Sequence, residues 1–226
     1  MNEQNSDSVY KTPEANLFEE EALPASLLNS MLTYAKLKLL FWLSLLYFLA
    51  TPPLVVISFM SGVVPERESY RLATDIVSLI DNLLYLYLLY MFKLLLNHRL
   101  ACHSVDNYIY AAIFLSLIMS ILSYAMPQEV DSFGVSTLGF FVLMVPLGVV
   151  NVLYGIKLLK LQSYFNYLRL YSWSTIIAGV FLASVVLFLL AIPAGMVSSF
   201  AMAMMFYTTA KELKRHHAGE RLSPNE

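Results

Sequence analysis

Asp75, Asp81 and Asn82 stand in an otherwise apolar stretch, residues 71–93, RLATDIVSLIDNLLYLYLLYMFK. Ionisable side chains are rare inside a bilayer, where they mark proton or ion pathways, hydrogen bonds between helices, or contacts with a partner. Apart from two tyrosines, the polar side chains of this helix fall within about one third of its circumference: Arg71, Asp75, Ser78, Asp81, Asn82, Tyr85 and Lys93. The pattern predicts a helix that turns its polar face toward other helices or a cavity and its apolar face toward lipid.

Depth separates the two aspartates of this helix. Asp75 is about one turn inside the membrane boundary and follows Arg71 by four residues, which predicts an interfacial ion pair. Asp81 lies about 13 Å along the helix, near the membrane middle, and no lysine or arginine occurs at that depth in another expected span. Three roles stay open for Asp81: a hydrogen bond between helices, proton or cation coupling, and a partner contact. For Asn151, a helix-packing hydrogen bond is the simpler role, and a place opposite this polar face is the alternative.

Composition indicates the elements that must position these residues. Hydrophobic residues make up 58% of the 226 residues, charged residues only 13%, and the mean hydropathy is +0.64, which is typical of a membrane protein. Apolar runs predict an all-α fold with six transmembrane helices at about residues 37–60, 72–96, 108–126, 134–159, 171–192 and 196–210. A tight Pro193-Ala194-Gly195 turn is expected between the last two.

The distribution of Lys and Arg predicts the orientation of these spans. The basic clusters all fall on one side if there are six spans: Lys36 and Lys38; Lys93 and Arg99; Lys157, Lys160 and Arg169; Lys211, Lys214 and Arg215. Because Lys and Arg favour the cytoplasmic side, we expect three consecutive helical hairpins with both termini in the cytoplasm. The corresponding organisation is a polar tail over 1–35, a membrane domain over 36–210 and a basic tail over 211–226.

Two short patterns suggest that the hairpins repeat. Ala-x-Pro occurs near the outer end of each odd-numbered span, at Pro52, Pro127 and Pro193, and a Leu-Tyr-x-x-Lys-like pattern begins before Tyr90, Tyr154 and Tyr207. Duplication of a two-helix unit would produce both patterns. Proline at helix ends and tyrosine at membrane interfaces would also produce them, so both explanations stay open.

No arrangement of residues predicts catalysis. Nucleophile, metalloprotease and phosphate-loop motifs are absent, and Asp75 and Asp81 point about 120° apart, which does not suit a carboxylate dyad. His98, Cys102 and His103 share one loop but form an incomplete zinc set. We therefore expect a protein that is not an enzyme, with no metal, no cofactor and no nucleic-acid partner.

The segment SVYKTPEANL, residues 8–17, resembles a short leader, Tyr-x-[Pro/Thr]-Pro-x-[Ala/Ser]-x-Leu, found before the first span of various bacterial inner-membrane proteins. The resemblance implies that membrane as the setting and no particular activity. Because little of the chain lies outside the spans, the leading hypothesis is binding of another membrane component, as an accessory subunit or an immunity-type inhibitor of a pore-forming toxin. The partner is then another membrane protein or a second copy of this chain. The alternative is a small-solute or proton-coupled transporter that uses Ser78, Asp81, Asn82, Tyr85 and Asn151.

Overall fold

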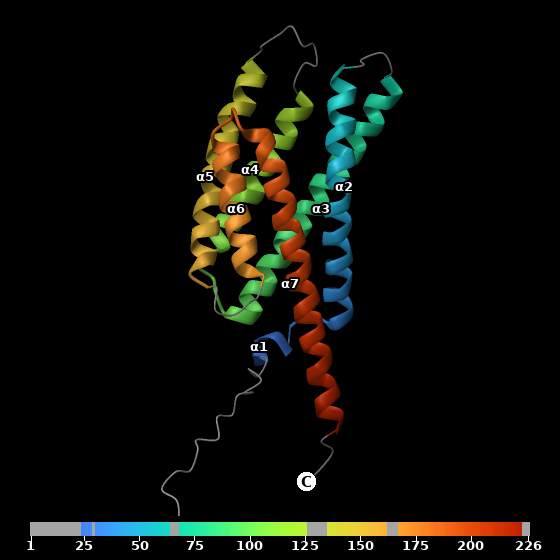
Figure 1. Cartoon of the computed structure of the whole chain (residues 1–226), viewed down its shortest axis with the longest axis vertical. Coiled ribbons are helices and arrows are strands. Elements are labelled where there is room, and N and C mark those ends of the chain that lie inside the picture. Colours follow the sequence, from blue (N-terminus) through green and yellow to red (C-terminus); the bar gives the residue numbers. More distant parts are fainter. Residues whose placement is uncertain (1–23, 29, 64–67, 126–134, 162–166, 223–226) are drawn as a thin grey trace, which may run out of the picture.

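The computed structural model describes residues 24–28, 30–63, 68–125, 135–161 and 167–222. This part of the chain contains seven helices and no strand (Figure 1). The helices are α1 (Ala25–Leu28), α2 (Tyr34–Val63), α3 (Glu68–Leu100), α4 (Asp106–Ala125), α5 (Val135–Leu159), α6 (Leu168–Ala183) and α7 (Phe188–Leu222).

Four of these helices are long and apolar enough to cross a membrane. The apolar stretches are Tyr34–Ile57 in α2, Thr74–Leu100 in α3, Phe141–Leu159 in α5 and Phe188–Ala218 in α7. A bilayer core of about 30 Å needs roughly 20 helical residues. Of the remaining three helices, α4 and α6 contain shorter apolar stretches, Asp106–Leu122 and Leu168–Ala183, and α1 has only four residues. The structure is thus all-helical, with several long apolar helices of the kind found in membrane proteins.

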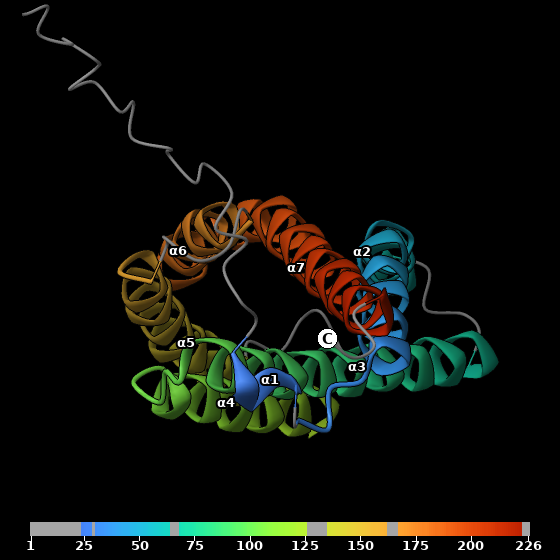
Figure 2. The same ribbon diagram turned by 90° about the horizontal axis from the view of Figure 1, so that it is seen from below.

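The six helices α2 to α7, called here the six long helices, form a ring. Seen along its axis, the order around the ring is α2, α7, α6, α5, α4 and α3 (Figure 2), and each neighbouring pair is in contact. Helices α2, α4 and α6 lead away from the end where α1 lies, and α3, α5 and α7 lead back toward it (Figure 1). We call the end that carries α1 and the C-terminal end of α7 the terminal end.

The prediction of a turn at Pro193-Ala194-Gly195 is wrong. Pro193 lies inside α7, which begins at Phe188, and the chain reverses earlier, between α6 and α7. There Val185 adopts a positive φ of 58°, while the Ser184 hydroxyl donates to the Phe181 carbonyl (2.7 Å) and accepts from the Leu187 amide (3.2 Å). Pro193 is the sixth residue of α7, so it lacks the amide that would bond to the Leu189 carbonyl, and the helix nevertheless continues through it. Proline inside an apolar helix is tolerated where neighbouring helices pack around it.

The repeated sequence patterns do not correspond to repeated environments. Pro52 lies within α2, as Pro193 does within α7, so neither ends a helix; Pro127 lies outside the described residues. Tyr154 is 2% exposed, whereas Tyr90 and Tyr207 are exposed. Duplication of the hairpins therefore stays a prediction.

The large buried side chains gather toward the terminal end. Phe92 and Phe206 are 0% exposed and Tyr154 is 2% exposed, and all three belong to one apolar cluster. Leu27 of α1 and Leu32 join this cluster with 1% and 2% exposure. Residues 24–28 and 30–33, expected to belong to a polar tail, therefore pack against the bundle, because Leu27 and Leu32 are removed from water there.

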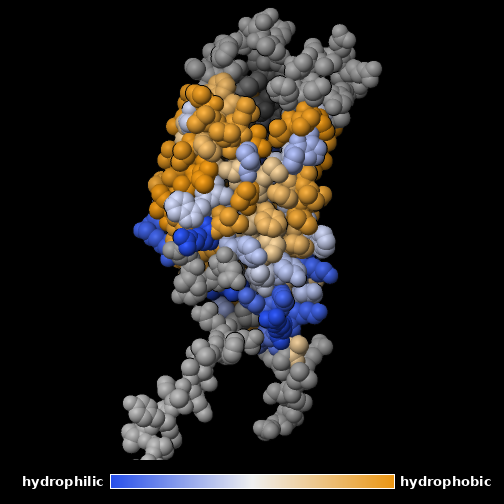
Figure 3. All heavy atoms as spheres, in the orientation of Figure 1, coloured by the Kyte–Doolittle hydropathy of each residue, from blue (hydrophilic) through white to orange (hydrophobic). Residues whose placement is uncertain are grey.

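The expected basic tail from residue 211 is also partly a continuation of the bundle. Helix α7 runs without interruption to Leu222, and Leu213 is buried in the apolar cluster. Hydrophilic residues gather on the lower part of the described surface, and apolar residues cover the part above it (Figure 3). Such a change from apolar to polar surface is typical of a helix bundle that leaves a membrane.

Helices α5 and α6 make the most extensive contact between any two helices of the described part. A Cβ atom on Gly148 would lie 2.5 Å from the Gly179 carbonyl oxygen and 2.5 Å from the Ala183 amide nitrogen, and one on Gly155 would lie 2.9 Å from the Ser172 carbonyl oxygen. Real side chains do not tolerate such distances. The two backbones can approach this closely only because glycine occupies these positions.

The glycine contact generates a stability prediction. Gly148→Ala should lower the free energy of unfolding by about 1–3 kcal/mol, because its Cβ must push two backbones apart. The measurement is the thermal unfolding midpoint in detergent micelles. Gly195→Ala in α7 is the matched control, because its Cβ would meet no atom within 4 Å and alanine favours a helix. Equal destabilisation by both variants would contradict the close α5–α6 contact.

Candidate functional site

A cavity of about 340 Å³ lies within the ring of helices, and each of the six long helices contributes to its lining. Polar groups line it from five helices: Tyr47 and Thr51 from α2, Tyr85 from α3, Asn151 and Tyr154 from α5, Tyr171 and Thr175 from α6, and Ser198 and Ser199 from α7. Apolar side chains fill the rest of the wall, among them Leu89, Leu182 and Met202. The cavity is therefore amphipathic.

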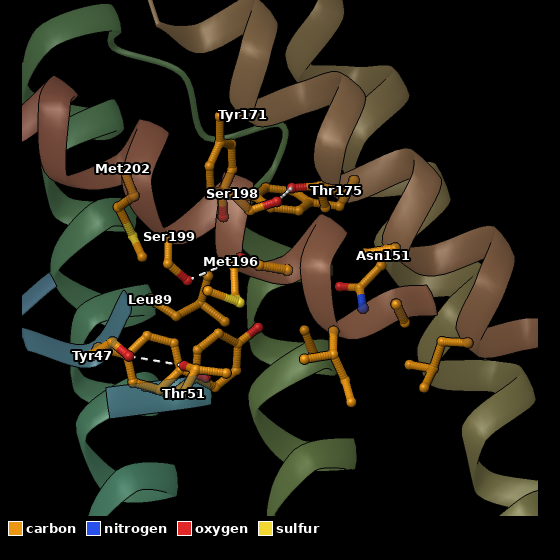
Figure 4. A pocket seen from close by; sticks show the side chains of 18 of the residues that line it. Tyr47, Thr51, Leu89, Asn151, Tyr171, Thr175, Met196, Ser198, Ser199 and Met202 are labelled. Atoms are coloured by element: carbon orange, nitrogen blue, oxygen red, sulfur yellow. Dashed lines mark hydrogen bonds between the residues drawn. The ribbon is translucent and has the colours of Figure 1, made fainter. Parts of the chain in front are cut away.

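Several hydroxyl groups of the cavity keep their oxygens available as acceptors. Thr51 donates to the Tyr47 carbonyl at 2.8 Å, and Ser199 donates to the Gly195 carbonyl at 3.0 Å (Figure 4). A hydroxyl that donates its proton to the preceding helical turn retains two lone pairs. Thr51 and Ser199 can therefore accept hydrogen bonds from a molecule in the cavity.

A second set of hydroxyl groups, those of Ser174, Thr175 and Ser198, forms a hydrogen-bond network between α6 and α7. The Ser198 hydroxyl lies 2.7 Å from that of Ser174 and 3.3 Å from that of Thr175. Thr175 and Ser198 line the cavity, and the labelled view places them together on its wall beside Tyr171 (Figure 4). Because these hydroxyls bond one another, they hold the two helices together as well as presenting polar atoms.

Asn151 is the amide of the cavity wall. Its side chain lies at the cavity (Figure 4), and among the described residues it makes no hydrogen bond. A Cβ atom on Gly179 would lie 3.0 Å from the Asn151 Cβ, so the close α5–α6 contact fixes the position of Asn151. An amide carries two donor hydrogens and an acceptor oxygen, and here all of them are free for a bound molecule.

The polar face predicted for residues 71–93 is divided among several environments. Tyr85 lines the cavity together with Asn151, and its ring stacks on that of Tyr47 with centroids 5.8 Å apart. The Asn82 amide nitrogen instead donates to the Ser120 hydroxyl of α4 at 2.6 Å, and Ser78 is exposed on the outside of the bundle. Of the predicted polar face, Tyr85 lines the cavity and Asn82 forms an interhelical hydrogen bond, but the face does not point inward along its whole length.

Asp81 does not line the cavity. It is half-buried one helical turn before Tyr85, which does line the cavity. The predicted Arg71–Asp75 pair is not tested, because the Arg71 side chain is outside the described part; Asp75 is half-buried and has an interaction of its own.

The apolar arc predicted to face lipid does so only in the half of α3 away from the terminal end. Ile76 and Ile80 are more than half exposed, whereas Leu86 and Leu88 are 8% and 0% exposed. Nearer the terminal end Leu88 belongs to the apolar cluster, so part of the arc is buried there, while Tyr87 and Tyr90 stay exposed. A single helical period cannot predict this change along the axis.

Two ion pairs at the terminal end were not predicted from the sequence. Lys93 is 7% exposed; its ammonium nitrogen lies 2.6 Å from the Tyr110 hydroxyl and 3.5 Å from the Asp106 carboxylate. Arg99 binds the Glu212 carboxylate at 2.7 Å, which joins α3 to α7. Arg99 was assigned only a topological role, and Lys93 was also placed on the polar face of residues 71–93, but the contacts of these two residues with neighbouring helices were not expected.

The loop with two histidines and a cysteine pairs internally. The Cys102 sulfur lies 3.1 Å from the Ser104 hydroxyl, and the His103 Nδ1 lies 3.3 Å from the Asp106 carboxylate. No group of three potential metal ligands occurs among the described residues.

The chain matches no family model, no curated protein and no solved structure. The cavity, its lining and its position among the helices are thus the basis for any assignment of function.

The Asn82–Ser120 hydrogen bond can be measured with a double-mutant cycle. We expect Asn82→Ala and Ser120→Ala each to lower stability, and the double variant to lose less than their sum, with a coupling of about 0.6–1.7 kcal/mol. Thermal unfolding of the four proteins in the same detergent measures this coupling. Strictly additive losses would mean that the 2.6 Å contact does not stabilise the α3–α4 pair.

Proposed function

We propose that the protein is a multi-pass membrane protein that binds a small uncharged solute in the central cavity and carries it across the membrane. In this proposal α2 to α7 all cross the bilayer, the terminal end faces the cytoplasm, and the membrane is the bacterial inner membrane. The observation that carries the proposal is the cavity, which all six long helices line. Its volume of about 340 Å³ is within the range of roughly 300–1,000 Å³ that small-molecule pockets occupy.

The six-span arrangement is supported by length and charge. Helix α4 has 20 residues, enough for a bilayer core of about 30 Å, and the 16 residues of α6 lie between two longer neighbours in the ring. Lys36, Lys157 and Lys211 all belong to the terminal end of their helices. Lys and Arg favour the cytoplasmic side, which supports the proposed orientation.

The chemistry of the wall supports an uncharged solute. The lining residues include hydroxyl groups, one amide and apolar side chains, and none of them is Asp, Glu, Lys, Arg or His. A charged solute would lose its hydration without gaining an opposite charge, which is costly in a low-dielectric site. A molecule with a hydrogen-bonding group and an apolar part fits the lining better.

The position of the apolar cluster supports entry from the end opposite α1. Phe92, Phe206 and Leu213 are buried between the cavity and the terminal end. Carriage across the membrane then requires this packed region to separate in a second conformation.

Binding of a membrane partner, which the sequence favoured, stays a prediction. An accessory subunit or immunity-type inhibitor acts through its outer surface and has no need of a cavity lined by a free amide. One preparation distinguishes the two functions: co-purification in mild detergent of a stoichiometric membrane protein, together with no solute binding, would favour the partner and overturn the carrier.

Asn151→Leu tests the binding site. We expect affinity for the best uncharged solute to fall about tenfold or more, because leucine has nearly the same size but neither donates nor accepts a hydrogen bond. The assay is a thermal-shift screen of short polyols, primary amides and alcohols, with charged amino acids as negative probes, followed by uptake into proteoliposomes. Asn82→Leu is the matched control and should keep full affinity, because Asn82 lies outside the cavity. Equal loss in both variants would contradict the site.

Asp81→Asn tests whether protons drive the proposed carriage. Because Asp81 is outside the cavity but one helical turn from Tyr85, which lines it, the variant should bind solute normally and lose the stimulation of uptake by an imposed pH gradient. Uptake into proteoliposomes with and without the gradient measures both. If the gradient has no effect on the unmodified protein, Asp81 has a structural role and the carriage is not proton-coupled.

A further inference from the structure

A second cavity lies at the terminal end, apart from the central one. It has a volume of about 590 Å³ and lies between the segment that joins α1 to α2 and the last part of α7. Its lining is formed by Leu28, Ser30, Leu32, Thr33, Tyr34 and Ala35 on one side and Leu213, Lys214, His217 and Ala218 on the other. We call it the terminal groove.

The walls of the terminal groove are held in place by buried contacts. Leu32 and Leu213 are 2% and 3% exposed and belong to the apolar cluster. The Ser30 hydroxyl donates to the Leu27 carbonyl at 2.7 Å and accepts from the Leu32 amide at 3.1 Å, and the Ser26 hydroxyl donates to the His98 carbonyl of α3. The groove is therefore preformed rather than a gap beside a loose tail.

The charge of the groove is positive. Lys214 and His217 line it, and its lining contains no carboxylate. Glu212, two residues before Lys214 on α7, is bound by Arg99 at 2.7 Å. His217 donates from Nδ1 to the Leu213 carbonyl (2.8 Å), because a carbonyl can only accept. This bond orients the ring, and Nε2 can donate to an anion when the imidazole is protonated.

The groove also lies where a membrane lipid has its headgroup. The apolar part of α2 begins at Tyr34, so residues 28–35 lie at the edge of the proposed span. An anionic lipid presents a phosphate at this depth and acyl chains next to it. The leucines of the groove meet the apolar part, and the cations and hydroxyls meet the phosphate.

We propose that the terminal groove binds the headgroup of an anionic phospholipid, with Lys214 and His217 contacting the phosphate. Orientation by positive charge requires Lys and Arg at this end, but it does not require them to line a preformed groove beside buried leucines. The proposal concerns a different site from the solute cavity and holds whether or not that cavity carries a solute.

Native mass spectrometry of the full-length protein in a neutral detergent tests the proposal. The probes are phosphatidylglycerol and phosphatidylcholine with identical acyl chains. We expect one tightly bound phosphatidylglycerol, at least tenfold weaker phosphatidylcholine, and a loss of about fivefold or more in phosphatidylglycerol affinity for Lys214→Ala/His217→Ala, since one Lys near a membrane surface contributes about fivefold. Both side chains are exposed, so the fold should persist, which the thermal midpoint checks.

Arg169→Ala is the matched control, because Arg169 is an exposed cation at the terminal end of α6 that does not line the groove. It should leave phosphatidylglycerol affinity unchanged. An equal loss in this control would show diffuse attraction and overturn the site. Equally tight binding of glycerol 3-phosphate would assign the groove to a soluble anion, and binding that occurs only after Glu19, Glu20 and Glu21 are changed to Gln would assign it to the chain's own acidic segment; either result overturns the proposal.

Discussion

The arrangement depends on the close contact between α5 and α6. In lipid, apolar side chains gain little by leaving their surroundings, so helices associate where small residues let backbones approach and where hydrogen bonds form. Gly148, Gly155 and Gly179 supply that approach, with positions where a Cβ would fall within 3 Å of another backbone. The same contact fixes Asn151, while α6 reaches α7 through the hydroxyls of Ser174 and Ser198. One wall of the central cavity is thus rigid because its helices cannot separate without losing these contacts.

Apolar side chains are buried more densely near the terminal end than in the rest of the bundle. This difference suggests different roles for the two regions. Around the terminal end, aromatic and leucine side chains pack tightly, and the Arg99–Glu212 pair joins α3 to α7. The cavity begins where that packing ends. Thr51 and Ser199 there donate to the preceding helical turn, and Ser198 bonds other hydroxyls. The Asn151 amide and the buried Tyr154 hydroxyl make no hydrogen bond within the described part of the chain, so both can bind a ligand. The terminal end thus holds most of the packed apolar core, and the proposed recognition of a solute takes place in the middle of the bundle.

The sequence predicted the all-helical class and most helix positions, because apolar runs of this length leave few alternatives. It also selected Tyr85 and Asn151, which line one cavity, because polar side chains in apolar helices avoid lipid. It failed at Pro193, because the effect of proline depends on where a helix begins, and that was decided by the turn at Ser184 and Val185. The cavity itself was not predictable, because it depends on the angles between helices. Leu27 was assigned to a tail because its partners are distant in the sequence.

The most direct measurement of the central claim is the reactivity of a thiol placed in the cavity. Ser199→Cys, in a Cys102→Ser background, should react with a small membrane-impermeant methanethiosulfonate reagent applied from the side opposite the terminal end, and not from the terminal side. Ser44→Cys is the control, because Ser44 is fully buried on α2 and does not line the cavity; it should not react. Reaction of Ser199→Cys only from the terminal side, or no reaction from either side, would contradict a solute cavity that opens away from the terminal end.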